Sequence, residues 1–138
     1  MKCRSAVILL AIAWTALAMG CRRSADSPGA GYTPDSRERL IEIGSMYKAY
    51  TTDHRDAPRK LSDFDPYEPA NQGGFAWIRD GACVMLWGGK PPEAGSSAVV
   101  LAYEAKVPHE GGLVLMQDGT VVEMNAAQFG AAPKAGEN

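Results

Sequence analysis

The chain has 138 residues, of which 46% are hydrophobic, and this length allows one domain with a modest core. Its 14 basic and 16 acidic residues give a net charge of −2. A slightly acidic chain lacks the basic stripe that binding to a phosphate backbone requires, so the composition argues against a nucleic-acid partner.

The N-terminus has the pattern of a bacterial export signal. Lys2 and Arg4 precede an uncharged run of 15 residues, AVILLAIAWTALAMG, which is too short to span a bilayer comfortably but suits a signal-peptide core. Gly20 at the end of this run is followed by Cys21, and this junction resembles the lipobox of bacterial lipoproteins. The resemblance implies that residues 1–20 are removed and that Cys21 is lipidated. An ordinary secretory signal and a short membrane anchor are the alternatives.

The segment after the signal is predicted to be a tether. Residues 21–34 comprise the lipidated Cys and a stretch rich in Ser, Gly, Ala and Pro, which as a flexible coil reaches about 20 Å. We therefore expect a cell-envelope protein that is held to a membrane by its lipid and faces the periplasm or the cell exterior. Arg22 favours the outer membrane over the inner one, because Asp at that position is an inner-membrane retention signal in some bacteria.

A folded domain is predicted over residues 35–132, and it begins with an amphipathic helix. Asp35 can act as the N-cap, with Glu38 three residues further on, and the helix should end near Asp53. Apolar residues recur along it at helical spacing and predict a face packed on the core. They are Leu40, Ile43, Met46, Tyr47 and Tyr50.

Four carboxylates lie close together in the sequence after this apolar stripe. They lack the Asp-x-Asp-x-Asp-Gly rhythm of a calcium loop, so a solvated polar loop is the favoured interpretation and a weak cation site is the alternative. They are Asp53, Asp56, Asp63 and Asp65.

The remainder reads as short strands separated by turn residues. Strands are expected at 75–78, 83–87 and 98–104, with a loop over 88–97 and a hairpin over 113–124. Asn125 can cap a short helix with Gln128 at its third position. One long helix followed by an antiparallel sheet is an α+β fold. Residues 133–138 are predicted to form a flexible tail.

The hairpin prediction fixes a register. Asp118-Gly119 as a two-residue turn pairs Met116 with Val121 and Leu115 with Val122. Alternate residues of the hairpin then share a face. Both faces are largely apolar, so we expect other parts of the chain to cover each of them in part. The face expected to contact the helix holds Leu113, Leu115, Val122 and Met124, and the other holds Val114, Met116 and Val121.

Signatures of common catalytic and metal sites are missing from the sequence. There is no H-E-x-x-H, no Cys-x-x-C and no G-x-S-x-G, so we expect no cofactor and no enzymatic activity. His109 and Asp118 would lie at opposite ends of a strand about 20 Å long, too far apart to share a metal ion. Cys83 lies in the apolar run CVMLW and is predicted to be buried and unreactive.

Glycine pairs and aromatic residues are weaker candidates for binding sites. The pairs at 73–74, 88–89 and 111–112 are interpreted as turns, because a phosphate loop would continue with Lys and a helix. Four aromatic residues are predicted to belong to the core, and a carbohydrate or peptide surface is the alternative. They are Tyr67, Trp77, Trp87 and Tyr103.

The C-terminal half resembles a known family. His109, eight intervening residues and then Asp118-Gly119 are similar to the H-X9-DG signature of prepilin-like proteins that are abundant in planctomycete bacteria. The stretch LIEIGSMYKAYTTDHRDAPRKLSDF is similar to their opening helix and Pro-containing turn. The resemblance covers residues 36–130 and looks closest to a lipoprotein branch. It implies a pilin-like or pseudopilin-like fold, a helix against an antiparallel sheet, with no established activity.

The chain differs from the family pattern in two respects. The spacing between His109 and Asp118 is one residue shorter than the signature, and the cleavage site and long apolar helix of a prepilin are missing. Leu40-Ile41-Glu42 is followed by polar residues within one turn, so this helix cannot insert into a membrane, and the lipid at Cys21 would replace a transmembrane helix. We therefore hypothesise a non-enzymatic envelope lipoprotein with an interaction or assembly module whose partners are envelope, secretion or pilus proteins. The alternative is a lipoprotein that binds a peptide, glycan or cation through loops 65–74 and 88–97.

Overall fold

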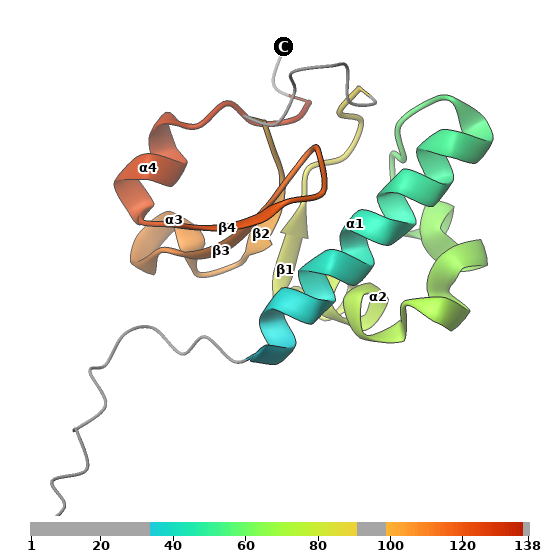
Figure 1. Cartoon of the computed structure of the whole chain (residues 1–138), viewed down its shortest axis with the longest axis horizontal. Coiled ribbons are helices and arrows are strands. Elements are labelled where there is room, and N and C mark those ends of the chain that lie inside the picture. Colours follow the sequence, from blue (N-terminus) through green and yellow to red (C-terminus); the bar gives the residue numbers. More distant parts are fainter. Residues whose placement is uncertain (1–33, 91–98, 137–138) are drawn as a thin grey trace, which may run out of the picture.

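The protein is described here by a computed structural model, which covers residues 34–90 and 99–136 (Figure 1). The signal segment, Cys21, the tether and most of the 88–97 loop lie outside these residues. The elements in chain order are α1 (Pro34–His54), the 3-10 helix η1 (Leu61–Ala70), α2 (Gln72–Arg79), β1 (Cys83–Met85), β2 (Val100–Glu104), α3 (Val107–Glu110), β3 (Gly112–Met116), β4 (Val121–Met124) and α4 (Ala126–Ala131).

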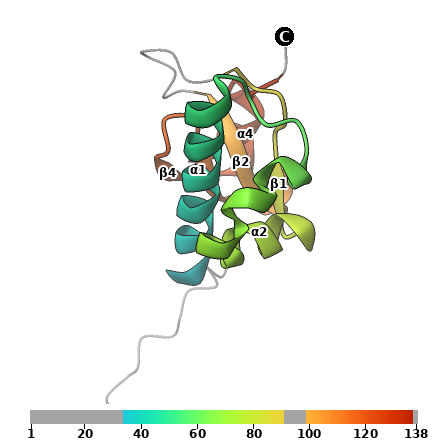
Figure 2. The same ribbon diagram turned by 90° about the vertical axis from the view of Figure 1, so that its right-hand side faces the viewer.

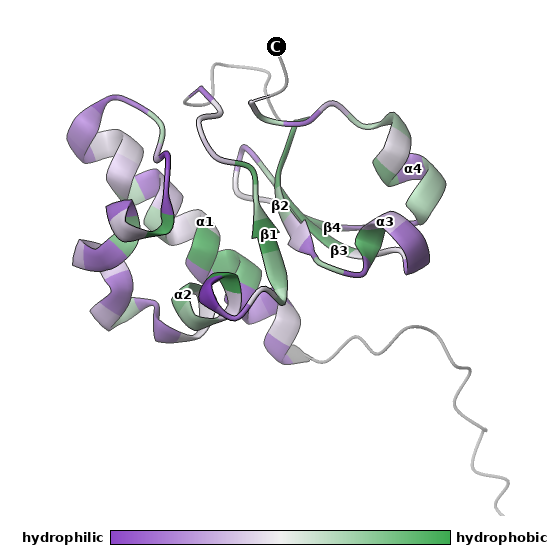
Figure 3. Ribbon diagram, turned by 180° about the vertical axis from the view of Figure 1, so that it is seen from behind, coloured by the Kyte–Doolittle hydropathy of each residue, from purple (hydrophilic) through white to green (hydrophobic). Residues whose placement is uncertain are grey.

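The strands form one antiparallel sheet in the order β1-β2-β3-β4, and helices cover both of its faces. α1, η1 and α2 pack on one face, whereas α3 and α4 pack on the other (Figures 1 and 2). Figure 3 shows the apolar colouring concentrated on the strands and on the helix turns that face them. The predicted α+β class is therefore confirmed.

α1 carries the predicted apolar stripe. Leu40, Ile43 and Met46 are fully buried, Tyr47 is 3% exposed, and Tyr50 packs at the edge of the same cluster. The predicted N-cap is wrong by about one residue, because the helix already includes Pro34. Asp35 therefore lies in the first turn, where its carboxylate forms an ion pair with Arg39. At the other end the helix continues to His54, one residue beyond the predicted end.

The predicted strand at 75–78 is wrong, because these residues belong to α2. A four-residue apolar run fits a helix as well as a strand, and tertiary contacts decide between them here. The first turn of α2 packs directly on α1, and a Cβ at Gly74 would lie 2.9 Å from the Arg39 carbonyl oxygen. The pair Gly73-Gly74 is thus a helix–helix contact and not the predicted turn.

The β3–β4 hairpin exists, but its register differs by one residue from the prediction. Leu115 pairs with Val121 and Val114 with Val122, so Gln117, Asp118 and Gly119 form a three-residue loop. A one-residue shift moves a strand's side chains to opposite faces. Val121 therefore joins the α1 side with Leu113 and Leu115, while Val122 and Met124 join the α3–α4 side.

The C-terminal segment also differs from the prediction of a free tail. Val100 of β2 donates to the Pro133 carbonyl, and its own carbonyl accepts a hydrogen bond from the Ala135 amide, both at 2.9 Å. Ala135 is 6% exposed. Residues 133–136 therefore extend the domain beyond its predicted end at 132. The capped helix at Asn125 is confirmed, since Asn125 and Gln128 exchange hydrogen bonds of 2.8 and 2.9 Å.

Candidate functional site

The three residues of the family signature do not form one site. His109 lies exposed on α3, directly before β3, whereas Asp118 and Gly119 lie in the loop after it. Five residues of β3 separate the two ends, about 17 Å at the rise of an extended strand. His109 and Asp118 thus lie at opposite ends of β3, as the sequence predicted.

Asp118 organises the β3–β4 loop. Its Oδ1 accepts hydrogen bonds from the amide of Thr120 at 2.9 Å and from the Thr120 hydroxyl at 2.7 Å. These two bonds lower the pKa of Asp118 below its ordinary value, so the carboxylate stays charged at neutral pH. Gly119 has φ of 89° and donates to the Met116 carbonyl at 2.9 Å, as expected of a tight turn closed by a left-handed residue.

A pocket of about 170 Å³ lies between α1 and this loop. Its walls come from segments about 70 residues apart in the sequence, and Figures 1 and 2 show the β3–β4 connection beside α1. Tyr47, Lys48 and Thr51 on α1 line one side, and Gln117 and Asp118 the other. Leu101 of β2, which is 1% exposed, contributes an apolar surface.

Polar groups at the edge of this pocket hold the chain that leaves β1. The Tyr47 hydroxyl donates to the carbonyls of Gly89 at 3.2 Å and Lys90 at 3.0 Å, and the Gln117 side-chain amide also donates to Lys90. Burial raises the pKa of Tyr47, while a hydrogen bond with Gln117 partly opposes the rise. Tyr47 therefore acts as a neutral donor here.

Sequence reasoning did not single out Lys48, Gln117 or Leu101. No motif joins them, because the pocket depends on the pairing of β3 with β2 and on the packing of α1 across both strands. One signal existed in Gly44, an unfavourable residue in the middle of a 21-residue helix. Gly44 lines the pocket.

Cys83 is buried and free, as predicted. Burial is the main cause that raises the pKa of its thiol to about 12, and the nearby charge of Glu104 adds to the rise against an opposing hydrogen bond with the Tyr103 backbone. A thiol with this pKa carries almost no thiolate at neutral pH. Cys83 is therefore a packing residue of β1.

Glu104, opposite Cys83 in the sheet, is a buried carboxylate with a structural role. Its Oε2 accepts a hydrogen bond of 2.8 Å from the amide of Leu113 and lies 3.8 Å from the Lys106 ammonium. The Leu113 amide at the end of the β2–β3 pairing therefore has the Glu104 side chain as its hydrogen-bond acceptor in place of a β2 carbonyl.

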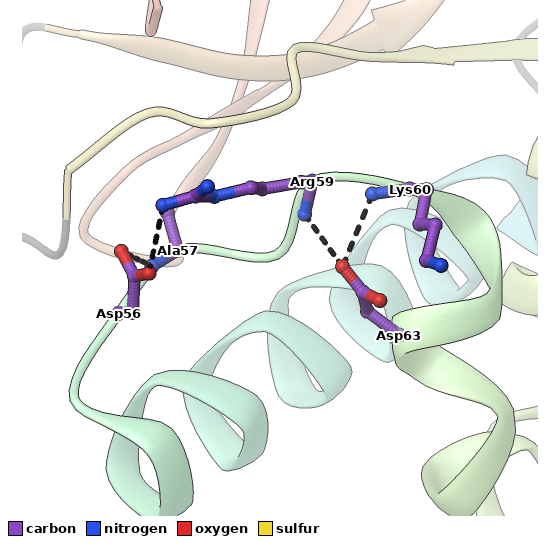
Figure 4. A network of polar contacts seen from close by, with 5 residues as sticks. All are labelled: Asp56, Ala57, Arg59, Lys60 and Asp63. Atoms are coloured by element: carbon purple, nitrogen blue, oxygen red, sulfur yellow. Dashed lines mark hydrogen bonds and ion pairs between the residues drawn. The ribbon is translucent and has the colours of Figure 1, made fainter.

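The acidic stretch after α1 is divided among separate local interactions. Figure 4 shows that Asp63 accepts from the amides of Arg59 and Lys60, at 2.7 and 3.2 Å, while Asp56 accepts from the Ala57 amide at 2.8 Å. In the part of the chain that the structure describes, no three His, Cys, Asp or Glu side chains are placed to hold a metal ion. The polar-loop interpretation is the one these contacts favour.

Asp53, the first of those carboxylates, lies in the last turn of α1 and accepts a hydrogen bond of 2.7 Å from Tyr67. This bond is the main cause that raises the pKa of the exposed Tyr67 hydroxyl to about 12. The pair connects the end of α1 with η1, which makes the contact a helix-to-helix bridge.

The aromatic candidates are half-buried and packed at the edges of the two apolar clusters. The Trp87 ring lies 5.6 Å from the Phe64 ring, the Tyr103 ring lies 4.6 Å from the Phe129 ring, and Arg39 lies over Trp77. These contacts favour the core interpretation over a binding surface.

The two segments assigned to the alternative function, 65–74 and 88–97, are described only in part. Apart from Asn71, residues 65–74 are helical, in η1 and α2, and these two helices pack on α1. Of residues 88–97, only 88–90 are described.

Comparison of the chain with protein families, with curated proteins and with solved structures yields no match. Within residues 34–90 and 99–136, no helix is long and apolar enough to cross a membrane.

Proposed function

We propose that this chain is a non-enzymatic lipoprotein of the bacterial cell envelope, anchored through Cys21. The observation that carries the proposal is the order of basic residues, 15 uncharged residues, Gly20 and Cys21 at the N-terminus. Lipoproteins of this kind carry more than one acyl chain, and two membrane signals suffice for stable anchoring where one does not. The outer membrane is the proposed location.

We further propose that the domain serves as a pseudopilin-like interaction module for envelope, secretion or pilus proteins. Support comes from α1, which packs along one face of a single antiparallel sheet, the arrangement that the prepilin-like resemblance implies. The exposed His109 precedes β3 and the Asp118-Gly119 loop follows it, which is the order of the family signature with eight intervening residues in place of nine.

Anchoring is tested by labelling cells with a fatty-acid analogue and separating their membranes. Wild-type protein should be labelled and sediment with the outer membrane, and Cys21→Ser should lose both properties. Cys83→Ser is the matched control, because it removes a cysteine and keeps the proposed lipid site. Label that persists in Cys21→Ser would overturn the proposal.

The interaction module is tested by purification of the lipidated protein from native membranes. Recovery of secretion or pilus components with wild type, and their loss when β4 is disrupted by Val122→Pro at unchanged lipidation, supports the module. Equal recovery with the disrupted domain would show that the anchor alone explains the association.

A further inference from the structure

We propose that the pocket between α1 and the β3–β4 loop binds a free amino acid with a branched aliphatic side chain, such as leucine. The pocket lies in the folded domain, and its lining residues alone carry the inference. The inference therefore does not rest on the function proposed above.

The pocket is open because two residues at its walls have no side chain. Gly44 lies in the middle of α1, where glycine is among the least favourable residues for a helix, and Gly119 lies directly across from it. A Cβ at Gly44 would lie 3.3 Å from a methyl carbon of Leu115 and 3.9 Å from the Gly119 Cα. Any larger residue at position 44 would therefore extend into the gap between helix and loop.

The bottom of the pocket is apolar. Leu101 is 1% exposed and Tyr47 is 3% exposed, so only a small part of each reaches the cavity. The register of β2 against β3 shifts between Val100 and Ala102, and Leu101 lies within this irregularity. Such irregularities often redirect a side chain beside a site. A hydrocarbon group is the part of a ligand that fits against this surface.

Opposite charges line the two walls. Lys48 is exposed on α1 and Asp118 is exposed on the loop, and neither forms an ion pair with any residue in the described ranges. Thr120 holds the Asp118 carboxylate in place through two hydrogen bonds, and the same bonds favour its charged form. The pocket therefore presents a fixed anion and a flexible cation on facing sides.

A zwitterion satisfies both walls at once. The ammonium of an α-amino acid would pair with Asp118, its carboxylate with Lys48, and its side chain would contact Leu101 and the Tyr47 ring. A simple anion would face Asp118 and a simple cation would face Lys48, so each would gain one contact and suffer one repulsion. The pocket should therefore bind the zwitterion more tightly than an amine or a carboxylate with the same hydrocarbon group.

The volume limits the side chain. A cavity of about 150 Å³ lined by aliphatic residues holds a benzene molecule, so the 170 Å³ here suits a group of four or five carbon atoms. The four-carbon side chains of leucine and isoleucine fall in this range, whereas the side chain of tryptophan exceeds it.

The test uses the full chain, ¹⁵N-labelled and titrated with L-leucine in a chemical-shift experiment. Matched probes are 3-methylbutylamine, which lacks the carboxylate, and 4-methylpentanoate, which lacks the ammonium. Leucine should shift the amides of Lys48, Gln117 and Gly119, and each half-ligand should bind about tenfold more weakly or worse, as expected for the loss of a charged hydrogen bond.

Two conservative variants complete the test. Lys48→Gln and Asp118→Asn should each weaken leucine binding about tenfold, since each removes one charge and keeps a polar side chain of similar size. Lys60→Gln, on the exposed start of η1, is the control and should bind like wild type. Unchanged melting temperatures show that the variants are folded. No shifts at 10 mM leucine, shifts that map elsewhere, equal binding of either half-ligand, or binding unaffected by the two variants would overturn the inference.

Discussion

The carboxylate of Glu42 on α1 accepts a hydrogen bond of 2.5 Å from the amide of Gly74 in the first turn of α2. The residue at the helix N-cap position, Asn71, makes no such bond with its own side chain. A side chain from a neighbouring helix thus satisfies one of the amides that a helix start leaves without a partner, and its charge complements the helix dipole. It also occupies the place where an anion would otherwise bind.

Removal of this contact should destabilise the domain. We expect Glu42→Ala to lower the free energy of unfolding by about 1–2 kcal/mol, the usual cost of losing a cap, and Glu42→Gln to lower it less because the amide oxygen still accepts. Chemical denaturation of the two variants measures the difference. Glu38→Ala, on the exposed face of α1, is the control, and an equal effect at positions 38 and 42 would contradict this account.

The loop between β3 and β4 gives a second prediction. A Cβ at Gly119 would meet no atom within 4 Å, so Gly119→Ala isolates the cost of φ at 89°, which should be about 1–2 kcal/mol. Gly130 in α4 also has open space but no positive φ, so Gly130→Ala should be neutral or stabilising. The melting temperatures of the two variants measure this difference in stability. His109→Ala should have little effect, and the reverse ranking would show that the loop geometry is wrong.

The register of this hairpin shows where the sequence was insufficient. Asp-Gly between apolar runs is compatible with a two-residue turn and with a three-residue loop that begins one residue earlier. Both turn types place the side chains of Leu113 and Leu115 on the face toward α1, so the packing of these two residues on the helix was predicted correctly. Only the β4 partners differ, and the sequence pattern of β4 cannot choose because Val121 and Val122 are both apolar.

The same limit applies to the rest of the fold. The apolar stripe of α1 was predictable because the helical spacing repeats regularly over a long segment. The burial of Cys83 was predictable because its neighbours are all apolar. Helix α2 was not predictable, because it depends on contacts with α1 that are remote in sequence, namely the hydrogen bond from Gly74 to Glu42 and the close approach of Gly74 to the α1 backbone. The pocket residues were not predicted either, because Leu101 and Lys48 meet only after the sheet has formed.

The Cys83 thiol should make stability depend on pH. Its pKa rises from an ordinary value of 9 to about 12 on folding, so between these pH values the folded state holds the proton more tightly than the unfolded state. Stability from this group is complete below pH 9 and falls by up to about 1.4 kcal/mol per pH unit above it. Urea denaturation of wild type and Cys83→Ala at pH 8 and 10 measures the loss, which should be smaller in the variant because only the raised pKa values of Tyr47 and Tyr67 still contribute. Equal pH dependence in both would contradict the burial of the thiol.

The end of α1 offers a stabilising substitution. Arg55 has φ of 54°, the left-handed conformation that commonly terminates helices and favours glycine, and its amide donates to the Thr51 carbonyl at 2.9 Å. Arg55→Gly should relieve this strain and stabilise the domain by up to about 1 kcal/mol. Arg59→Gly, at an exposed position without positive φ, is the control and should not stabilise. A lower melting temperature for Arg55→Gly would contradict the prediction.

The anchor at Cys21 is the central claim, and intact-protein mass spectrometry of material purified from the native membrane tests it most directly. We predict a chain that begins at Cys21 and whose mass includes a diacylglyceryl group, with a further acyl chain where the amine is also modified. Digestion should place the added mass on the peptide that begins at Cys21. An unmodified chain, or one that begins at any other residue, would contradict the account.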